Sequence, residues 1–297
     1  MKLVKNISLK IFSLILAVLF VFGCSQSNKI TDSWVNPDAT KESIKFNKVA
    51  LSVNAHPDDA EAWNAGALKL LKDKGYKIVI ATMTGGDLGG CNMNMEETAR
   101  VRFEEAKKAA AVLDAEYYSM GGIDGFLYDT KEMRLKLISL IRKVRAGVIF
   151  THLSVDYHSD HRTTAAIVEA AAMVCSLDTV PVPEKPVEVT PLLYHSSPLT
   201  LTDPMGSQIV PPHFLVDVTS VIETKRQMLE CHVSQIDLMR HMHKMDDFFG
   251  FVLEGNRNYG KMAGVEYAEV YWQHLGGGFQ KEPQVQEDLS EYLINKF

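Results

Sequence analysis

The residues best suited to chemistry in this sequence are histidines and aspartates gathered in two short motifs. The first, Ala55-His-Pro-Asp-Asp-Ala-Glu61, follows an apolar run that predicts a buried strand. His56 and Asp59 stand three positions apart across the start of an expected helix, so their side chains can converge on one point. A histidine nitrogen and a carboxylate oxygen suit a catalytic zinc ion, which keeps one position open for water. Asp58 must point elsewhere, which leaves it free to act as a base on that water.

The second motif, Asp156-Tyr-His-Ser-Asp-His161, follows another apolar run further along the chain. Its two histidines, His158 and His161, can approach one point at the start of a helix. Two His-Asp groups after two strand ends favour a single His–Asp–His zinc site. Taken alone, the first motif has a second interpretation, in which its acidic residues only favour the dipole at a helix N-terminus.

The elements that must position these motifs alternate along the chain. We expect strands at 49–53, 78–81, 116–120 and 148–150, and helices at 60–74, 96–113, 132–145 and 161–175. Strands separated by crossover helices pair in parallel, with helices on both faces of the sheet. Ligands of such sheets bind beyond the carboxyl ends of the strands, where both motifs lie. The prediction is an α/β fold with a Rossmann-like, mostly parallel sheet.

The pattern becomes less regular after about residue 176. A stretch rich in proline is followed by expected extended segments at 192–195 and 214–218 and by an expected helix at 219–244. This region contains no internal repeat and no low-complexity linker. We therefore predict one domain, 46–297, whose C-terminal part is an irregular α+β region.

The N-terminus predicts export. Three lysines precede the apolar run Ile11–Phe22, which is too short to span a bilayer comfortably and is typical of a secretory signal peptide. Val21-Phe-Gly-Cys24 resembles the bacterial lipobox, in which the cysteine is lipidated. We predict a signal peptide at 1–23, lipidation of Cys24, a tether at 24–45, and a chain anchored to the bacterial cell envelope on its periplasmic or cell-surface side. A plain N-terminal membrane helix is the other interpretation.

Composition and charge exclude several classes of protein. With 46% apolar and 23% charged residues in 297, the chain has the composition of an ordinary globular protein. The formal charge of −6 becomes −9 once residues 1–23, with their three lysines, are removed. An acidic domain without a basic run argues against a nucleic-acid partner. Cys91, Cys175 and Cys231 are too widely spaced to predict a cysteine metal site.

The sequence resembles the LmbE-like/PIG-L family of zinc-dependent deacetylases, from about Val49 to His274. The motifs that carry the resemblance most specifically are A-H-P-D-D-x-E at 55–61 and H-x-D-H at 158–161. Weaker matches support it: Thr84-Gly-Gly-Asp87, Arg102-Phe-Glu-Glu-Ala106, Asp124-Gly125, and Lys225 with His232-Val-Ser-Gln235. The loop Gly89–Met95, with three Met or Cys residues, is peculiar to this chain.

The resemblance implies a role for each site residue. The metal ligands would be His56, Asp59 and His161, binding Zn²⁺ or another divalent ion such as Fe²⁺. Asp58 would be the general base, a protonated His158 would stabilise the tetrahedral species, and Asp160 would orient a histidine. Substrate contacts would come from Arg102, Asp87 and Asp124; a surface salt bridge between Arg102 and Glu105 is an equal alternative for that arginine.

The implied activity is removal of an acetyl group from an N-acetylglucosamine-type sugar or glycoconjugate. Trp63, Tyr128 and Tyr157 are aromatic side chains that could stack on a sugar face. A nucleotide-dependent enzyme is disfavoured because no G-x-G-x-x-G follows the first strand. A non-catalytic glycan-binding lipoprotein with a vestigial metal site is the remaining alternative, although every chemically required side chain is present. The sequence does not indicate whether the protein is a monomer or an oligomer.

Overall fold

The computed structural model describes residues 44–197 and 200–294. The predicted signal peptide (1–23), the lipidation site Cys24 and nearly all of the predicted tether (24–45) lie outside the described residues. Within the described part of the chain, no helix is both long enough and apolar enough to cross a membrane.

Strands and helices alternate through the first two thirds of the chain, as the sequence pattern predicts. The elements, in chain order, are β1 (Val49–Asn54), α2 (Asp59–Trp63), α3 (Ala65–Asp73), β2 (Lys77–Thr84), α4 (Met95–Val112), β3 (Glu116–Gly122), α5 (Lys131–Val144), β4 (Val148–His152), α6 (Ser159–Val174), β5 (Leu192–Ser196), β6 (Phe214–Asp217), η1 (Thr219–Val221), α7 (Ile222–Leu229), α8 (Val233–His243), α9 (Phe248–Ala263), β7 (Ala268–Gln273), α10 (Gln284–Asp288), η2 (Ser290–Tyr292) and β8 (Leu293–Ile294).

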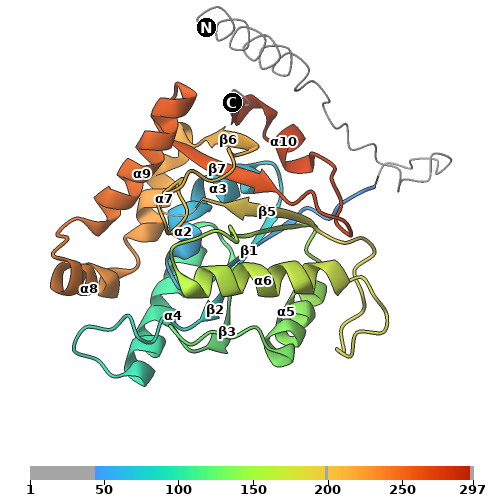
Figure 1. Ribbon diagram of the computed structural model, residues 1–297, viewed down its shortest axis with the longest axis horizontal. Coiled ribbons are helices and arrows are strands. Elements are labelled where there is room, and N and C mark those ends of the chain that lie inside the picture. Colours follow the sequence, from blue (N-terminus) through green and yellow to red (C-terminus); the bar gives the residue numbers. More distant parts are fainter. Residues whose placement is uncertain (1–43, 198–199, 295–297) are drawn as a thin grey trace, which may run out of the picture. The chain divides into compact units, whose positions relative to one another are not determined.

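All of these strands join one sheet in the order β3-β2-β1-β4-β5-β7-β6-β8. From β3 to β5 every neighbouring pair is parallel, because a helix carries the chain back between successive strands. The strands β7, β6 and β8 add antiparallel pairs at the other edge. The predicted Rossmann-like, mostly parallel fold is therefore confirmed, and its C-terminal part is a mixed extension of the same sheet (Figure 1).

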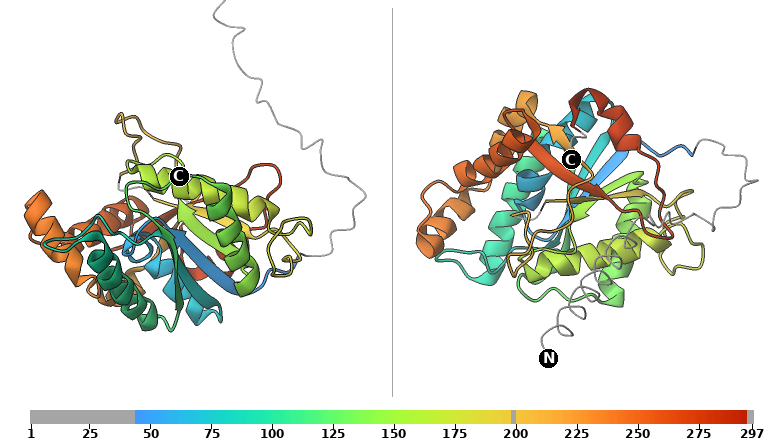
Figure 2. Two further views of the ribbon diagram at one scale, coloured as in Figure 1. Left: turned by 90° about the horizontal axis from the view of Figure 1, so that it is seen from below. Right: turned by 45° about the horizontal axis from the view of Figure 1, so that its top comes forward.

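Helices cover both faces of the sheet (Figure 2). On one face, apolar side chains of α3, α4 and α7 pack on Phe150, Tyr194 and Tyr271. On the other face, α5 and α6 pack on Leu51, Val79 and their neighbours. Alternate residues of β1 and β4 thus face opposite cores, which explains why these buried parallel strands are apolar almost throughout.

Two expected helices are each divided in the structure. The helix expected at 60–74 breaks at Asn64, whose backbone leaves helical geometry (φ −128°, ψ −13°). Its side-chain amide donates a hydrogen bond to Ser52 Oγ on β1, at 3.0 Å. The helix expected at 219–244 becomes η1, α7 and α8, with a break before His232, which is fully buried. In both cases a fully buried polar side chain stands at the break.

Strand β7 was not predicted, although it lies inside the sheet between β5 and β6. Its sequence, Ala-Glu-Val-Tyr-Trp-Gln, is buried at every position, including Glu269 and Gln273. Two polar residues in a fully buried strand hide the apolar pattern by which such a strand is recognised.

Glu269 forms a buried ion pair that joins β7 to two helices. Its carboxylate accepts hydrogen bonds from the backbone N–H groups of Gly66 and Ala67 at the start of α3, at 2.9 and 2.8 Å. Lys225 Nζ of α7 donates at 2.7 Å and the Tyr271 hydroxyl at 2.8 Å. Lys225 of the K…H-x-S-Q motif therefore has a structural role here, with none of its side chain exposed.

Candidate active site

The two His-Asp motifs meet at the carboxyl ends of β1 and β4. These strands are parallel neighbours, with Ser52 opposite Phe150, so the loops that follow them emerge side by side. The strand order reverses direction at this pair, because β2 lies on one side of β1 and β4 on the other. Ligand sites of open α/β sheets lie at such a switch point.

The loop after β1 is shaped by a left-handed residue. Asp58 has φ 96° and ψ −23°, a conformation that is rare outside glycine and is found in aspartate more often than in most residues. Immediately after it, Asp59 opens α2 and its Oδ2 accepts a hydrogen bond from the backbone N–H of His56, at 2.7 Å. The turn therefore directs two adjacent carboxylates to different places. Backbone strain held in this way is typical of functional sites.

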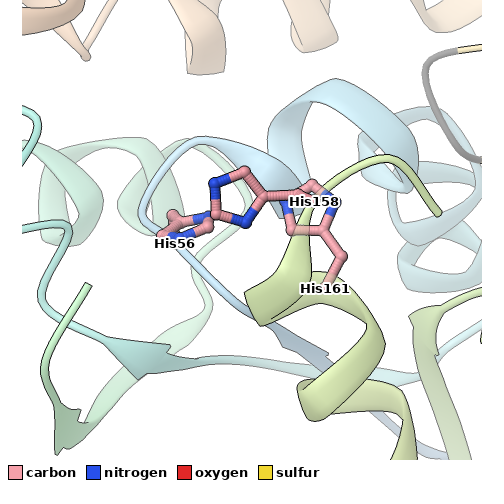
Figure 3. A group of neighbouring side chains, drawn as sticks. All are labelled: His56, His158 and His161. Carbon is pink, nitrogen blue, oxygen red and sulfur yellow. The ribbon is translucent and has the colours of Figure 1, made fainter. Parts of the chain in front are cut away.

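His56, Asp59 and His161 come together, as the sequence predicts. His56 Nδ1 lies 3.3 Å from Asp59 Oδ2, and His161 Nε2 lies 3.3 Å from Asp59 Oδ1. His158 joins the group from the start of α6, and one ligating nitrogen from each of the three histidines lies within 4.8 Å of the others (Figure 3). All of these side chains are buried except His158, which is half-buried.

A carboxylate faces the outer ring nitrogen of both candidate metal ligands. His56 Nε2 lies 3.1 Å from Asp124 Oδ1 and 3.4 Å from Asp160 Oδ2. His161 Nδ1 lies 3.0 Å from Asp156 Oδ1. Metal-binding histidines usually donate their other N–H to a carboxylate or carbonyl in this way. The nitrogens left to face one another across Asp59 are then Nδ1 of His56 and Nε2 of His161.

The electrostatics of the cluster suit a cation. Burial alone would lower the pKa of His161, but the carboxylates of Asp59 and Asp156 raise it to about 9. Against the same effect of burial, Asp124, Asp160 and Asp59 raise the pKa of His56. Burial would raise the pKa of Asp59, and His161 and His152 lower it instead. A site that holds protons this tightly can exchange them for a divalent metal ion, because metal binding releases protons from its ligands.

His152 is a component that the sequence analysis missed. It is the last residue of β4 and is fully buried, with Nε2 accepting a hydrogen bond from the backbone N–H of Ala55 at 2.9 Å. Its ring stacks on that of His161, with centroids 3.9 Å apart and planes 7° from parallel. Burial and the charge of His161 lower the pKa of His152 to about 4. A neutral His152 therefore supports both the His56 loop and the His161 ring.

Arg102 of α4 binds the loop that carries Asp58. Its guanidinium donates to the carbonyl oxygens of Gly86 and Pro57, at 3.0 and 2.5 Å, and to Asp58 Oδ2, at 3.2 Å. The alternative surface pairing with Glu105 is wrong, because Arg102 is only 3% exposed and faces the site. Burial raises the pKa of Asp58 to about 6, against the opposing effect of Arg102.

The glycine-rich loop after β2 makes room for that guanidinium. Gly86 has φ +61°, and a Cβ atom there would stand 2.2 Å from Arg102 Nη1. A Cβ atom on Gly89 would stand 2.5 Å from the same nitrogen. Gln235 Nε2 donates to the carbonyl of Gly89, at 3.1 Å, and so holds the loop in place. The start of the Gly89–Met95 loop therefore packs directly against the guanidinium of Arg102.

Asp87 and Asp124, predicted to bind substrate, lie against each other and against the cluster. Asp87 is buried, and its Oδ1 accepts a hydrogen bond from the backbone N–H of Asp124 at 3.0 Å. Asp124, half-buried, faces His56. Together they connect the loops after β2 and β3 to His56, one of the candidate metal ligands. The contacts that the structure gives them are therefore internal ones.

His158 and Asp160 lie at the start of α6. The backbone N–H of Asp160 donates to His158 Nδ1 at 3.2 Å, which caps the helix and leaves the ring proton on Nε2. Asp160 Oδ2 accepts from the backbone N–H of Gly125, at 2.7 Å, beside His56. Burial, with the nearby charges of His56 and His161, lowers the pKa of His158. The lowered pKa favours a neutral ring, whereas the resemblance implied a protonated one.

The H-x-S-Q segment joins α8 to the elements that carry the site. His232 Nε2 lies 3.4 Å from Glu61 Oε1 of α2, and both side chains are buried. The backbone N–H and the hydroxyl of Ser234 donate to Glu105 of α4, at 2.8 and 2.7 Å. These contacts fix α2 and α4, the two helices that position Asp59 and Arg102.

The aromatic residues proposed to contact a sugar differ in exposure. Trp63 is 8% exposed and packs with Leu229, Phe249 and their neighbours, so it is not available for stacking. Tyr128 and Tyr157 are 68% and 54% exposed. Tyr157 lies next to the cluster, with its ring centroid 5.5 Å from that of His161. Of these three aromatic residues, only the two tyrosines can offer an exposed ring to a ligand.

Comparison with known proteins finds sequence similarity to proteins named as deacetylases. Residues 51–172, which hold both His-Asp motifs, match the PIG-L family, described as GlcNAc-PI de-N-acetylase. The chain is 27% identical over 238 residues to a diacetylchitobiose deacetylase of Thermococcus kodakarensis, with 75% of this chain and 81% of the relative covered.

Two solved structures share the fold. The N,N′-diacetylchitobiose deacetylase of Pyrococcus horikoshii, determined with an inhibitor, superposes with a TM-score of 0.65 at 23% identity, covering 76% of this chain and 84% of that one. A 4-carboxy-2-hydroxymuconate hydratase of Pseudomonas putida gives a TM-score of 0.64 at 21% identity, covering 79% and 99%. Proteins of this fold therefore carry names of more than one activity, and the site must decide the chemistry.

Proposed function

We propose, for a chain whose residues 51–172 form a PIG-L family domain, that it is a zinc-dependent hydrolase of N-acetyl groups on N-acetylglucosamine-type sugars. The observation that carries the proposal is the convergence of His56, Asp59 and His161 beside a separate, half-buried carboxylate, Asp58. Zinc ligands and a base are the two parts that hydrolysis of an amide by water requires.

His56, Asp59 and His161 would hold the ion. Two nitrogens and one carboxylate oxygen form the ligand set of many catalytic zinc sites, and Fe²⁺ accepts the same donors. When bound, the ion lowers the pKa of water and polarises a carbonyl group. Asp124, Asp160 and Asp156 would fix the ring orientation and tautomer of the two histidines.

Asp58 would accept the proton of the attacking water. Its carboxylate is held by Arg102 and not by the histidine cluster, so it stays available as a base. Its pKa, which burial raises to about 6, keeps it ionised at neutral pH and makes it a stronger base than an exposed aspartate.

His158 would stabilise the tetrahedral species as a neutral donor. Because its Nδ1 accepts from Asp160, the proton on Nε2 is free to bind a developing oxyanion. The departing amine must gain a proton, and the protonated Asp58 is the nearest acid produced by the first step. The products are acetate and a free amino sugar.

The substrate class rests on the relatives and on the exposed rim. A curated relative and a structural neighbour are both named as diacetylchitobiose deacetylases. Tyr128 and Tyr157 offer exposed rings of the kind that pack against sugar faces. The predicted lipidation of Cys24 would place the enzyme on the bacterial cell envelope, with residues 1–23 removed, 24–45 as tether and 46–297 as the catalytic domain, where glycans are within reach.

The test is acetate release from sugars by the zinc-loaded chain. N-acetylglucosamine and N,N′-diacetylchitobiose are supplied to the parent and to His161→Ala, and acetate is measured enzymatically. The proposal expects release by the parent and none by the variant. Sugar binding by a zinc-loaded or iron-loaded parent that releases no acetate would instead support the non-catalytic glycan-binding alternative.

A further inference from the structure

A second group of metal-ligating side chains lies outside the candidate active site. It consists of Glu169 on α6, His195 on β5 and His274 just after β7, and one ligating atom from each lies within 4.8 Å of the others. His195 Nε2 is 3.3 Å from His274 Nδ1 and 3.7 Å from Glu169 Oε1. His274 Nδ1 is 4.0 Å from the same carboxylate oxygen. The three residues share no sequence motif.

The sheet register explains why the two histidines meet. β5 and β7 are antiparallel, with His195 opposite Trp272, and the backbone N–H of His274 donates to the carbonyl of Leu193. His274 is therefore the diagonal neighbour of His195 on the same face of the sheet, within reach of a long side chain. This is the face that α6 covers, and Glu169 approaches from it.

The hydrogen bonds of His195 leave a lone pair directed into the group. Its Nδ1 lies 2.8 Å from the carbonyl oxygen of His152, so Nδ1 carries the proton and donates it. Burial lowers the pKa of His195 to about 4, which leaves the ring neutral and Nε2 without a proton. Nε2 then faces a carboxylate oxygen of Glu169, and two electron-pair donors 3.7 Å apart favour a cation between them. A ligand histidine whose other N–H binds a backbone carbonyl is the usual arrangement at metal sites.

The position of His274 is fixed by its surroundings. Its ring packs on Phe279, with centroids 4.1 Å apart. A Cβ atom on Gly276 would stand 2.7 Å from His274 Nε2, so the glycine leaves room for the ring to direct Nδ1 toward His195. The side chains of His274 and Glu169 are 22% and 33% exposed, which gives an ion a path from solvent.

We propose that Glu169, His195 and His274 form a second divalent-metal site that binds Zn²⁺. Two imidazole nitrogens and one carboxylate oxygen are a set that zinc accepts, with a remaining position for water. The site is distinct from the catalytic cluster, because it uses none of its ligands, and it adjoins it through the His195–His152 hydrogen bond. Bound zinc would join α6, β5 and the end of β7.

Zinc content measured by plasma mass spectrometry tests this directly. The full-length parent, Glu169→Gln and His274→Gln are equilibrated with zinc and desalted. His161→Ala serves to remove the catalytic ion alone, and His241→Gln, an exposed histidine of α8, is the matched control. The expectation is about two equivalents per chain in the parent and control, and about one in each of the other three variants. Thermal unfolding of each variant verifies that it is folded.

Each outcome separates the two sites. If both Glu169→Gln and His274→Gln bind as much zinc as the parent, there is no second site. The approach of His195 to His274 is then a direct hydrogen bond between the two rings, with no ion between them. One equivalent in the parent and none in His161→Ala overturns it as well. One equivalent that survives in His161→Ala but is lost in Glu169→Gln supports the second site and contradicts zinc at the catalytic cluster.

Discussion

Arg102 Nη2 lies 3.2 Å from Asp58 Oδ2, although the two residues are 44 positions apart. The same guanidinium binds the backbone on both sides, at Pro57 and Gly86. Arg102 thus fixes the position of Asp58, the residue proposed as the base. The conformation of Arg102 depends in turn on the loop that contains Gly86.

Arg102→Lys should lower kcat for acetate release by about 10- to 100-fold, the usual effect of losing a residue that orients a catalytic group. A lysine ammonium cannot bind three acceptors in the planar geometry of a guanidinium. Zinc content should be unchanged, because Arg102 contacts no proposed ligand. A parental kcat in this variant would show that Asp58 does not need the arginine.

Gly86→Ala should reduce acetate release about as much as Arg102→Lys, because the new Cβ atom would displace the guanidinium. The positive φ of +61° adds a cost to stability of about 1 kcal/mol or more. Gly75→Ala is the matched control: its φ is +86°, and nothing lies within 4 Å of the added atom. It should lose stability and keep its rate. Equal rates in the two variants would contradict the account of the loop.

Lys225→Met should destabilise the fold by about 3–5 kcal/mol, because it leaves the buried Glu269 carboxylate without its cation. Lys69→Met removes an exposed i,i+4 pair with Asp73 and should change stability by no more than about 1 kcal/mol. Urea unfolding of both variants measures the difference. Similar midpoints for the two would mean that the interior pair contributes no more than a surface one.

Cys175 should resist alkylation in the native protein across the neutral and mildly alkaline range. Burial raises its pKa to about 12, so the reactive thiolate forms only as the pH approaches that value. Cys91 and Cys231 are half-exposed and should be modified first. Peptide mass spectrometry after iodoacetamide treatment at pH 7 to 9 identifies the labelled sites. Early labelling of Cys175 without denaturant would contradict its burial.

The sequence predicted the parts of the fold and site that depend on local pattern. Apolar runs between helices identified the parallel strands, and the motifs after β1 and β4 placed His56, Asp59 and His161 at one edge of the sheet. His152 was missed because it ends the strand itself, where a buried histidine has no motif around it. The pairing of Arg102 with Asp58, and not with Glu105, depends on how α4 packs against the site.

The group of Glu169, His195 and His274 could not be predicted from the local sequence pattern for a different reason. His195 and His274 are 79 positions apart, and they meet only because β7 inserts antiparallel beside β5. β7 itself was not predicted, because the buried Glu269 and Gln273 interrupt its apolar pattern. Contacts that depend on such long-range pairing become visible only once the sheet order is known.

Zinc content and acetate release, measured together on Asp58→Asn and His161→Ala beside the parent, distinguish a metal ligand from a general base. We predict that Asp58→Asn keeps its zinc and loses about 10²- to 10⁴-fold in rate, as expected for a general base. His161→Ala should lose its rate and the catalytic equivalent of zinc. Equal zinc loss in the two variants, or parental turnover by Asp58→Asn, would contradict the assignment of ligand and base.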